Sequence, residues 1–158
     1  MNATANMTKR ATEKALDCFK IQFGAKSSNE SFARMVAAAF VSRLDPTVSE
    51  LADIKTAVSE AVTNCIVHAY RYAQGEKTIY MKGTLYASGK VVIEIKDKGC
   101  GIEDLQEAMQ PMFTTDAAGE RSGMGFTVMD AFCDKVRVRS KSGRGTTVVL
   151  TKRVESGV

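Results

Sequence analysis

Apolar residues recur at every second position in several stretches of the chain, which is typical of strands with one buried face. Phe19, Ile21 and Phe23 form the first such stretch, and Val91, Ile93 and Ile95 form another. With their neighbours and two Gly-containing turns, these patterns predict five strands, at residues 19–23, 78–86, 91–96, 135–140 and 146–152. The last two should form a hairpin that turns at residues 143–145.

Other stretches repeat their apolar residues at helical spacing. The first predicted helix is capped by Ser28 or Asn29, with one side that carries Phe32, Met35, Val36, Ala39 and Phe40. A second should run from Asp45, as N-cap before Pro46, to about Tyr72. Shorter helices are expected near residues 104–108 and 126–133.

Helices combined with antiparallel hairpins, without repeating βαβ units, predict an α+β fold. We expect a sandwich in which helices pack on one face of a mixed, mainly antiparallel sheet. Residues 18–153 should form a single domain, between a flexible N-terminal tail at 1–17 and a C-terminal tail at 154–158. A chain of 158 residues is long enough for one continuous core.

Composition narrows the class of protein. The net charge of +4 is spread along the chain, which disfavours direct nucleic-acid binding. The four cysteines form no CxxC pair and there is one histidine, which argues against zinc. The sequence shows neither a membrane-spanning run nor a signal peptide, so we expect a cytoplasmic protein with reduced thiols and no membrane partner.

The second predicted helix carries Glu60 and Asn64 one turn apart, on a stripe nearly opposite its apolar face. The neighbouring polar residues have short side chains, whereas a face turned to water would usually carry more Lys and Arg. The Asn64 amide oxygen suits Mg²⁺, which binds few protein ligands besides phosphates and water. Glu60 could take a proton from an attacking hydroxyl or water. A simply solvated stripe is the alternative.

Asp97 continues the apolar alternation of its strand, so its carboxylate should enter the buried side. A buried carboxylate needs donors, and the exocyclic amine of adenine is one. Gly99 and Gly101 follow directly and would let a ring approach the backbone. The alternative is an Asp-Gly turn that merely ends the strand.

A long loop at residues 111–122 leads into the sequence Ser122-Gly-Met-Gly-Phe126. Free amides at a helix N-terminus beside glycines predict an anion site, without the GK[ST] ending of a P-loop. Arg121 could grip a terminal phosphate through its planar guanidinium. A flexible loop with one solvated arginine is the alternative.

The ordered ExxxN, DxGxG and GxG segments resemble the Bergerat (GHKL) ATP-binding family. Within it, the chain is similar to the sporulation anti-sigma-F factors, serine-protein kinases of spore-forming bacteria. The resemblance covers about residues 19–152 and is sharpest in the segments at 29–34, 44–47, 58–64, 110–115 and 120–126.

That resemblance implies site roles. Glu60 is expected to be the catalytic carboxylate, Asn64 the Mg²⁺ ligand, Asp97 the adenine reader and Arg34 a partner-binding residue. The remaining residues expected to bind ATP are Gly99, Gly101, Thr114, Thr115, Arg121, Ser122, Gly123, Met124, Gly125 and Thr146.

The family also implies partners and an activity. The chain should form a homodimer, bind and inhibit a sporulation sigma factor, and phosphorylate a serine of an anti-anti-sigma protein with Mg-ATP. Two alternatives stay open at this point: an ATPase module in which Glu60 activates water, and a binding module that holds ATP without transferring phosphate. The first is disfavoured because no transducer domain follows Lys152.

Overall fold

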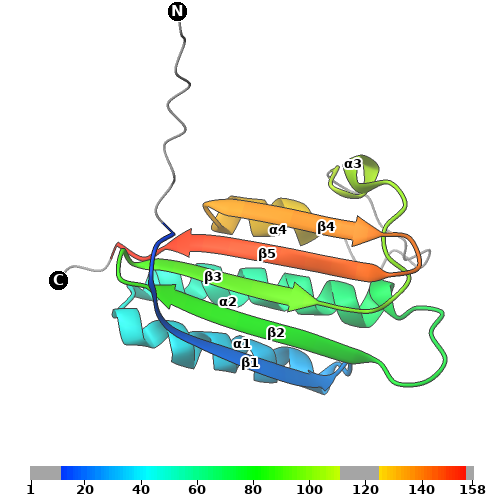
Figure 1. Ribbon diagram of the computed structural model, residues 1–158, viewed down its shortest axis with the longest axis horizontal. Helices are drawn as coiled ribbons and strands as arrows, with labels where there is room; N and C mark the ends of the chain where they lie inside the picture. The colour runs from blue at the N-terminus through cyan, green and yellow to red at the C-terminus, as the bar shows by residue number, and fades with distance from the viewer. Residues whose placement is uncertain (1–11, 111–124, 156–158) are drawn as a thin grey trace, which may run out of the picture.

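The computed structural model describes residues 12–110 and 125–155 of the chain. Its five strands form one sheet in the order β1-β2-β3-β5-β4, and all four pairings are antiparallel (Figure 1). The strands are β1 (Ala15–Gly24), β2 (Thr78–Tyr86), β3 (Lys90–Lys96), β4 (Lys135–Lys141) and β5 (Gly145–Arg153). The α+β class is confirmed, with a wholly antiparallel sheet among these residues.

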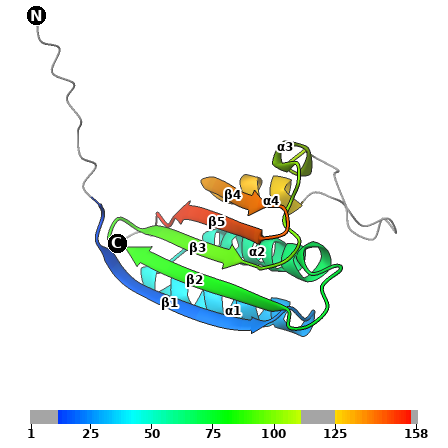
Figure 2. The same ribbon diagram turned by 45° about the vertical axis from the view of Figure 1, so that its right-hand side comes forward.

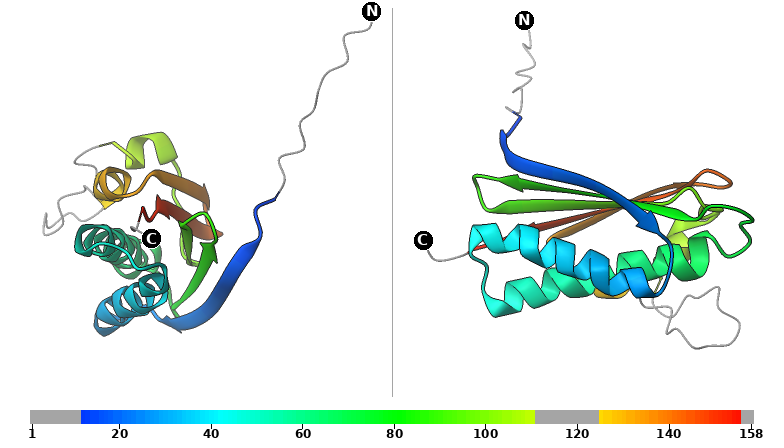
Figure 3. Two further views of the ribbon diagram at one scale, coloured as in Figure 1. Left: turned by 90° about the vertical axis from the view of Figure 1, so that its left-hand side faces the viewer. Right: turned by 90° about the horizontal axis from the view of Figure 1, so that it is seen from below.

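The long helices lie together on one face of this sheet (Figure 3). They are α1 (Ser28–Val41), α2 (Val48–Asn64) and α4 (Gly125–Phe132), and α2 packs against both of the others. The short helix α3 (Leu105–Ala108) lies beyond the end of the sheet, beside the β4–β5 turn (Figure 2). This layering confirms the predicted arrangement of helices on one face.

The core lies between α2 and the central strands. Val91, Ile93 and Ile95 of β3 are buried, as their alternation predicted. From α2, the buried residues are Ile54, Ala57, Val58, Ala61 and Val62. The predicted apolar face of the second helix is therefore correct, and it leaves Glu60 and Asn64 on another side.

The apolar side predicted for α1 coincides only in part with the side that packs on the core, against which Phe40 lies. The helix buries Ala33, Ala37, Ala38 and Val41, whereas Phe32 and Met35 are 47% and 58% exposed. Alanines allow close packing between helix and core, so Phe32 and Met35 lie outside. The cap is also different, because the helix starts after Ser27 and the Asn29 side chain donates to the Gly24 carbonyl at 2.8 Å.

The predicted start of α2 at Asp45 was wrong. Thr47 is the N-cap, and its hydroxyl accepts from the Glu50 amide at 3.1 Å while the Glu50 carboxylate accepts from the Thr47 amide at 2.8 Å. This reciprocal capping box satisfies two amides that the helix leaves unpaired. Asp45 instead follows the 3-10 turn η1 (Ser42–Leu44) with a φ of 52°.

Two further boundaries differ from prediction. β1 begins at Ala15, four residues before the predicted start at Phe19, because its N-terminal part still pairs with β2. The second helix is α-helical only to Asn64 and continues as the π-helix η2 (Cys65–Ala69), short of Tyr72. Such wider turns inside helices are frequent at functional sites.

Candidate nucleotide site

Glu60 and Asn64 lie near the C-terminal end of α2, half-buried, and face the first residue of α4. A Cβ placed on Gly125 would lie 3.1 Å from Asn64 Oδ1 and 3.4 Å from Glu60 Oε2. Packing of α4 against α2 therefore brings Glu60 and Asn64 next to Gly125, the last glycine of the predicted phosphate-binding segment at residues 122–126. A glycine at this position leaves room for both polar side chains.

Six predicted ATP contacts, Thr114, Thr115, Arg121, Ser122, Gly123 and Met124, lie outside the described residues. Their roles stay predictions. Of the phosphate segment, the structure places Gly125 and Phe126, at the start of α4.

Asp97 directly follows β3 and is 4% exposed, as its position in the alternation predicted. Its Oδ1 accepts from the backbone amides of Gly99 at 2.9 Å and Thr146 at 3.2 Å. Its Oδ2 lies 3.6 Å from Cys65 Sγ. Burial raises the pKa of Asp97, and the bonds from these two amides and from the thiol oppose that rise.

The glycines around Asp97 allow close approaches within the protein itself, and the role toward a base that the sequence suggested for Gly99 and Gly101 stays a prediction. A Cβ on Gly99 would lie 2.1 Å from the Ala69 carbonyl oxygen, and one on Gly101 would lie 2.1 Å from that of Lys141. Gly145, which the sequence did not single out, would meet the Asp97 carbonyl at 2.2 Å. These glycines let neighbouring backbones of the protein itself approach closely.

Thr146 reaches Asp97 through its backbone amide, while its hydroxyl lies 2.8 Å from that of Ser140. The Ser140 hydroxyl also accepts from the Ile102 amide at 2.8 Å. The β4–β5 hairpin thus holds both the carboxylate and the loop that follows it. Strand parity was the one signal for Ser140, because it continues the inward-facing side of β4.

Cys65 and Tyr70 are further residues that sequence reasoning did not assign to the site. Cys65 falls on the apolar face of its helix, and Tyr70 follows η2 with its side chain 4% exposed. The Tyr70 hydroxyl accepts from the Lys98 amide at 2.9 Å and donates to the Thr78 carbonyl. Tyr70 therefore links the loop after Asp97 to the start of β2.

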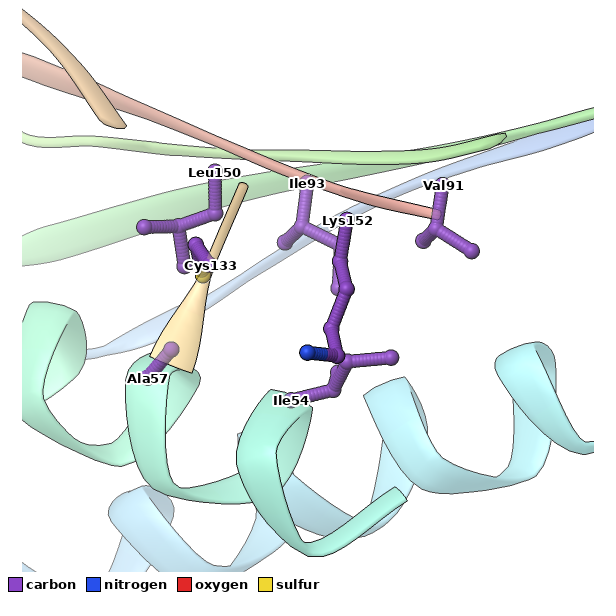
Figure 4. Close-up of a pocket in the computed structure, with 7 residues that line it drawn as sticks. All are labelled: Ile54, Ala57, Val91, Ile93, Cys133, Leu150 and Lys152. Carbon is purple, nitrogen blue, oxygen red and sulfur yellow. The ribbon is translucent and has the colours of Figure 1, made fainter. Parts of the chain in front are cut away.

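The described structure also has a gap in the core and an open groove at the surface. The first, of about 10 Å³, lies in the core between α2, β3 and β5, where Cys133 and Lys152 line it with apolar residues (Figure 4). It is barely the size of one water molecule, so it is a packing gap. The second is an open groove on α1 and α2 that contains both Arg34 and Glu60.

This geometry can serve two tasks. Near Gly125, a carboxylate and an amide oxygen lie beside a helix N-terminus, which suits phosphates, one metal ion and a proton transfer. Next to β3, a fixed carboxylate can accept a hydrogen bond from a base. Among the described residues, no cluster of three or more His, Cys, Asp or Glu could hold a metal by itself.

Known proteins match this arrangement. The family model for the histidine kinase-like ATPase domain matches residues 23–152. An anti-sigma F factor of Thermoanaerobacter sp. (strain X514) is 54% identical over 87% of this chain and 94% of its own length. One from Priestia megaterium is 49% identical, over 85% and 90%.

Solved structures share the fold at lower identity. The RsbU and RsbW domains from Mycobacterium tuberculosis match with a TM-score of 0.63 at 22% identity, over 87% of this chain and 32% of that one. A blue-light activated histidine kinase domain from Erythrobacter litoralis matches with a TM-score of 0.54 at 15% identity, over 79% and 60%.

In the described ranges, none of the helices combines the length and apolarity that a bilayer crossing requires. The matched family model spans most of the chain, and about half of the residues are identical to those of the curated relatives. The chain therefore belongs to the histidine kinase-like (GHKL) ATPase domain family and, within it, to the anti-sigma F factors.

Proposed function

We propose that this protein is a cytoplasmic anti-sigma factor and protein serine kinase. It would bind and inhibit a sporulation sigma factor and, with Mg-ATP, phosphorylate a serine of an anti-anti-sigma protein. The observation that carries the proposal is the convergence of Glu60, Asn64 and Gly125, from α2 and α4, in one family-matched domain that also buries Asp97. The names of the relatives support the regulatory part.

Asp97 and its neighbours would bind the base of ATP, and the residues at the start of α4 would bind its phosphates. Asp97 would accept a hydrogen bond from the adenine amine, since its carboxylate is held by backbone donors and is nearly buried. The N-terminus of α4 would face the phosphates. The residues that precede it, with Arg121, are proposed to complete the phosphate contacts.

Transfer would rely mainly on positioning and charge. The serine oxygen bonds to the γ-phosphorus as the bond from that phosphorus to ADP breaks, and the hydroxyl proton passes to the Glu60 carboxylate. Asn64 Oδ1 fits as the single protein ligand of Mg²⁺, because it lies beside the glycine that opens α4. The metal would neutralise charge on the phosphates.

The groove that holds Arg34 and Glu60 favours the approach of a protein substrate from the side of α1 and α2. Arg34 Nη1 lies 2.9 Å from Glu30 Oε1 and 3.4 Å from Ser59 Oγ, so its guanidinium is held beside the groove. We propose that both protein partners use this surface, next to the catalytic carboxylate.

We also propose a homodimer. Phe32 and Met35 leave large apolar surfaces on the outer side of α1, and Leu16 of the edge strand β1 is 61% exposed. Exposed apolar side chains on adjacent elements are typical of protein interfaces. Analytical ultracentrifugation of a variant with Phe32→Ser and Met35→Ser should give a monomer. A wild-type protein that sediments as a monomer at micromolar concentration would refute the dimer.

Glu60→Gln tests the kinase. We expect phosphate transfer from labelled ATP to the antagonist to fall by about 10²–10⁴-fold, because a general base is lost. The affinity for ATP, by calorimetry, should stay close to that of the wild type. Glu76→Gln, an exposed acid in the segment before β2, is the matched control and should transfer normally. A normal transfer rate for Glu60→Gln would refute the role of Glu60.

The same assay separates the alternatives. Label that appears as free phosphate, with none on the antagonist, would favour an ATPase. ATP binding without either product would favour a binding module. For the sigma factor, Arg34→Ala should weaken the complex while ATP affinity holds, with the exposed Lys26→Ala as control. An unchanged sigma affinity would argue against that surface.

A further inference from the structure

The contact between Cys65 and Asp97 ties the π-helix η2 to the end of β3. Cys65 is 3% exposed, and its Sγ lies 3.6 Å from Asp97 Oδ2. The other carboxylate oxygen, Oδ1, already accepts from the amides of Gly99 and Thr146. Two amides therefore anchor Oδ1, and the thiol lies against Oδ2.

The thiol can act here only as a donor. Its Sγ lies within hydrogen-bonding distance of Asp97 Oδ2, and an ionised carboxylate accepts on both oxygens and has no proton to donate. The Cys65 S–H thus favours the charged, accepting form of Asp97.

The form of this carboxyl group decides which base fits. A carboxylate accepts from the exocyclic amine of adenine. A protonated carboxyl group could instead donate to the carbonyl oxygen that hypoxanthine and guanine carry at the same ring position. A donor that opposes protonation of Asp97 therefore favours the amine-bearing base.

We propose that Cys65 is a positioning residue that orients Asp97 and keeps it as an acceptor, so that it sets the preference for adenine over 6-oxo purines. The inference rests on the proposed function, since it takes the Asp97 pocket as the base site. The residue itself would not touch the nucleotide. The alternative is a cysteine that only fills the core.

The chain offers a matched control for that alternative. Cys133 is also partly buried, and it lines the small core gap between α2 and the sheet shown in Figure 4. Cys133→Ala removes the same atoms from the core without contacting Asp97. A cost that arises only from lost packing should therefore be similar for Cys65→Ala and Cys133→Ala.

The experiment measures the affinities of full-length protein for ATP and inosine triphosphate by calorimetry. For Cys65→Ala, we expect the preference for ATP to fall by about five- to tenfold, as suits one weak thiol donor. Cys65→Ser, which keeps a donor, should restore the preference. Cys133→Ala should keep the wild-type ratio of affinities.

The outcomes separate the inference from the proposed function. A Cys65→Ala protein with the wild-type ratio, or one that matches Cys133→Ala, would overturn the role of Cys65 alone. If the wild type binds neither nucleotide, or if Asp97→Asn leaves the ratio unchanged, the base site itself is wrong. Thermal unfolding of each variant without nucleotide confirms that the compared proteins are folded.

Discussion

On the base side of the proposed site, Asp97 and its neighbours are fixed by backbone contacts. Gly99, Gly101 and Gly145 each allow a close approach to a carbonyl group of another segment. On the transfer side, the side chains of Glu60 and Asn64 are only half-buried and lie beside Gly125. The base side is thus part of the folded core, whereas the transfer side can change without changing the fold.

This difference predicts that substitutions on the base side affect stability most. In Gly145→Ala, the new methyl group would meet the Asp97 carbonyl at 2.2 Å, at a backbone φ of +93°. Because neither backbone can give way easily, we expect a loss of at least about 3 kcal/mol in the free energy of unfolding, measured with urea.

Gly143→Ala is the matched control, in the same β4–β5 turn. It has a similar φ of +76°, but nothing lies within 4 Å of the added carbon. Backbone strain alone should cost about 1–2 kcal/mol. If both variants lose the same stability, the close approach at Gly145 does not matter.

Asp97→Asn should separate binding from folding on the base side. The amide oxygen can still accept from Gly99 and Thr146, so the fold should persist. Its NH₂ group, however, would face the adenine amine, and two donors cannot form a hydrogen bond with each other. We expect ATP affinity to fall by about 10–100-fold, since a hydrogen bond to a charged group is lost. Calorimetry that finds unchanged affinity would exclude Asp97 as the base reader.

Sequence patterns predicted those features of the two sides that depend on strand alternation or on helical spacing. Alternation along β3 placed Asp97 inside, and the period of α2 separated Glu60 and Asn64 from its apolar face. The apolar side predicted for α1 differs from its most buried side, because Phe32 and Met35 dominate the apolar pattern although the buried residues are mainly alanines.

Contacts between distant segments could not be predicted in the same way. Asp97 meets Thr146 because Lys96 pairs with Thr147 in the β3–β5 register, which no local pattern encodes. Cys65 reaches Asp97 from a π-helix whose wider turn the helical period does not reveal. The need for glycine at position 145 depends on the same register.

On the transfer side, Gly125→Ala should have a moderate effect on function and a small one on stability. The added methyl group would lie 3.1–3.4 Å from the ends of Asn64 and Glu60, side chains that can shift by a few tenths of an ångström. We expect phosphate transfer to fall by about tenfold, because small displacements of catalytic groups slow chemistry.

The stability of Gly125→Ala in urea should change by less than about 1 kcal/mol, since Ala suits a helix better than Gly. A loss of stability as large as that of Gly145→Ala would remove the distinction between the two sides.

The smallest expected effect is a pH dependence of stability that belongs to Asp97. Burial raises the pKa of Asp97 in the folded protein above the ordinary value of 3.8. At pH values between the unfolded and the folded pKa, the folded state therefore binds more protons than the unfolded state. The contribution of Asp97 to stability should therefore decrease as pH rises from about 3.8 through the folded pKa, and stay constant above it.

The titratable groups near this carboxylate, Cys65 and Tyr70, have raised pKa values and stay neutral in that acidic window. Other carboxyl groups, such as Glu50, have lowered pKa values and change stability in the opposite direction. The difference between wild type and Asp97→Asn, measured by urea unfolding at each pH, cancels those groups and isolates Asp97. A difference that grows in favour of the wild type as pH rises would mean that its hydrogen bonds outweigh its burial. The charged carboxylate of Asp97 would then stabilise the base side, because its hydrogen bonds would exceed the cost of its burial.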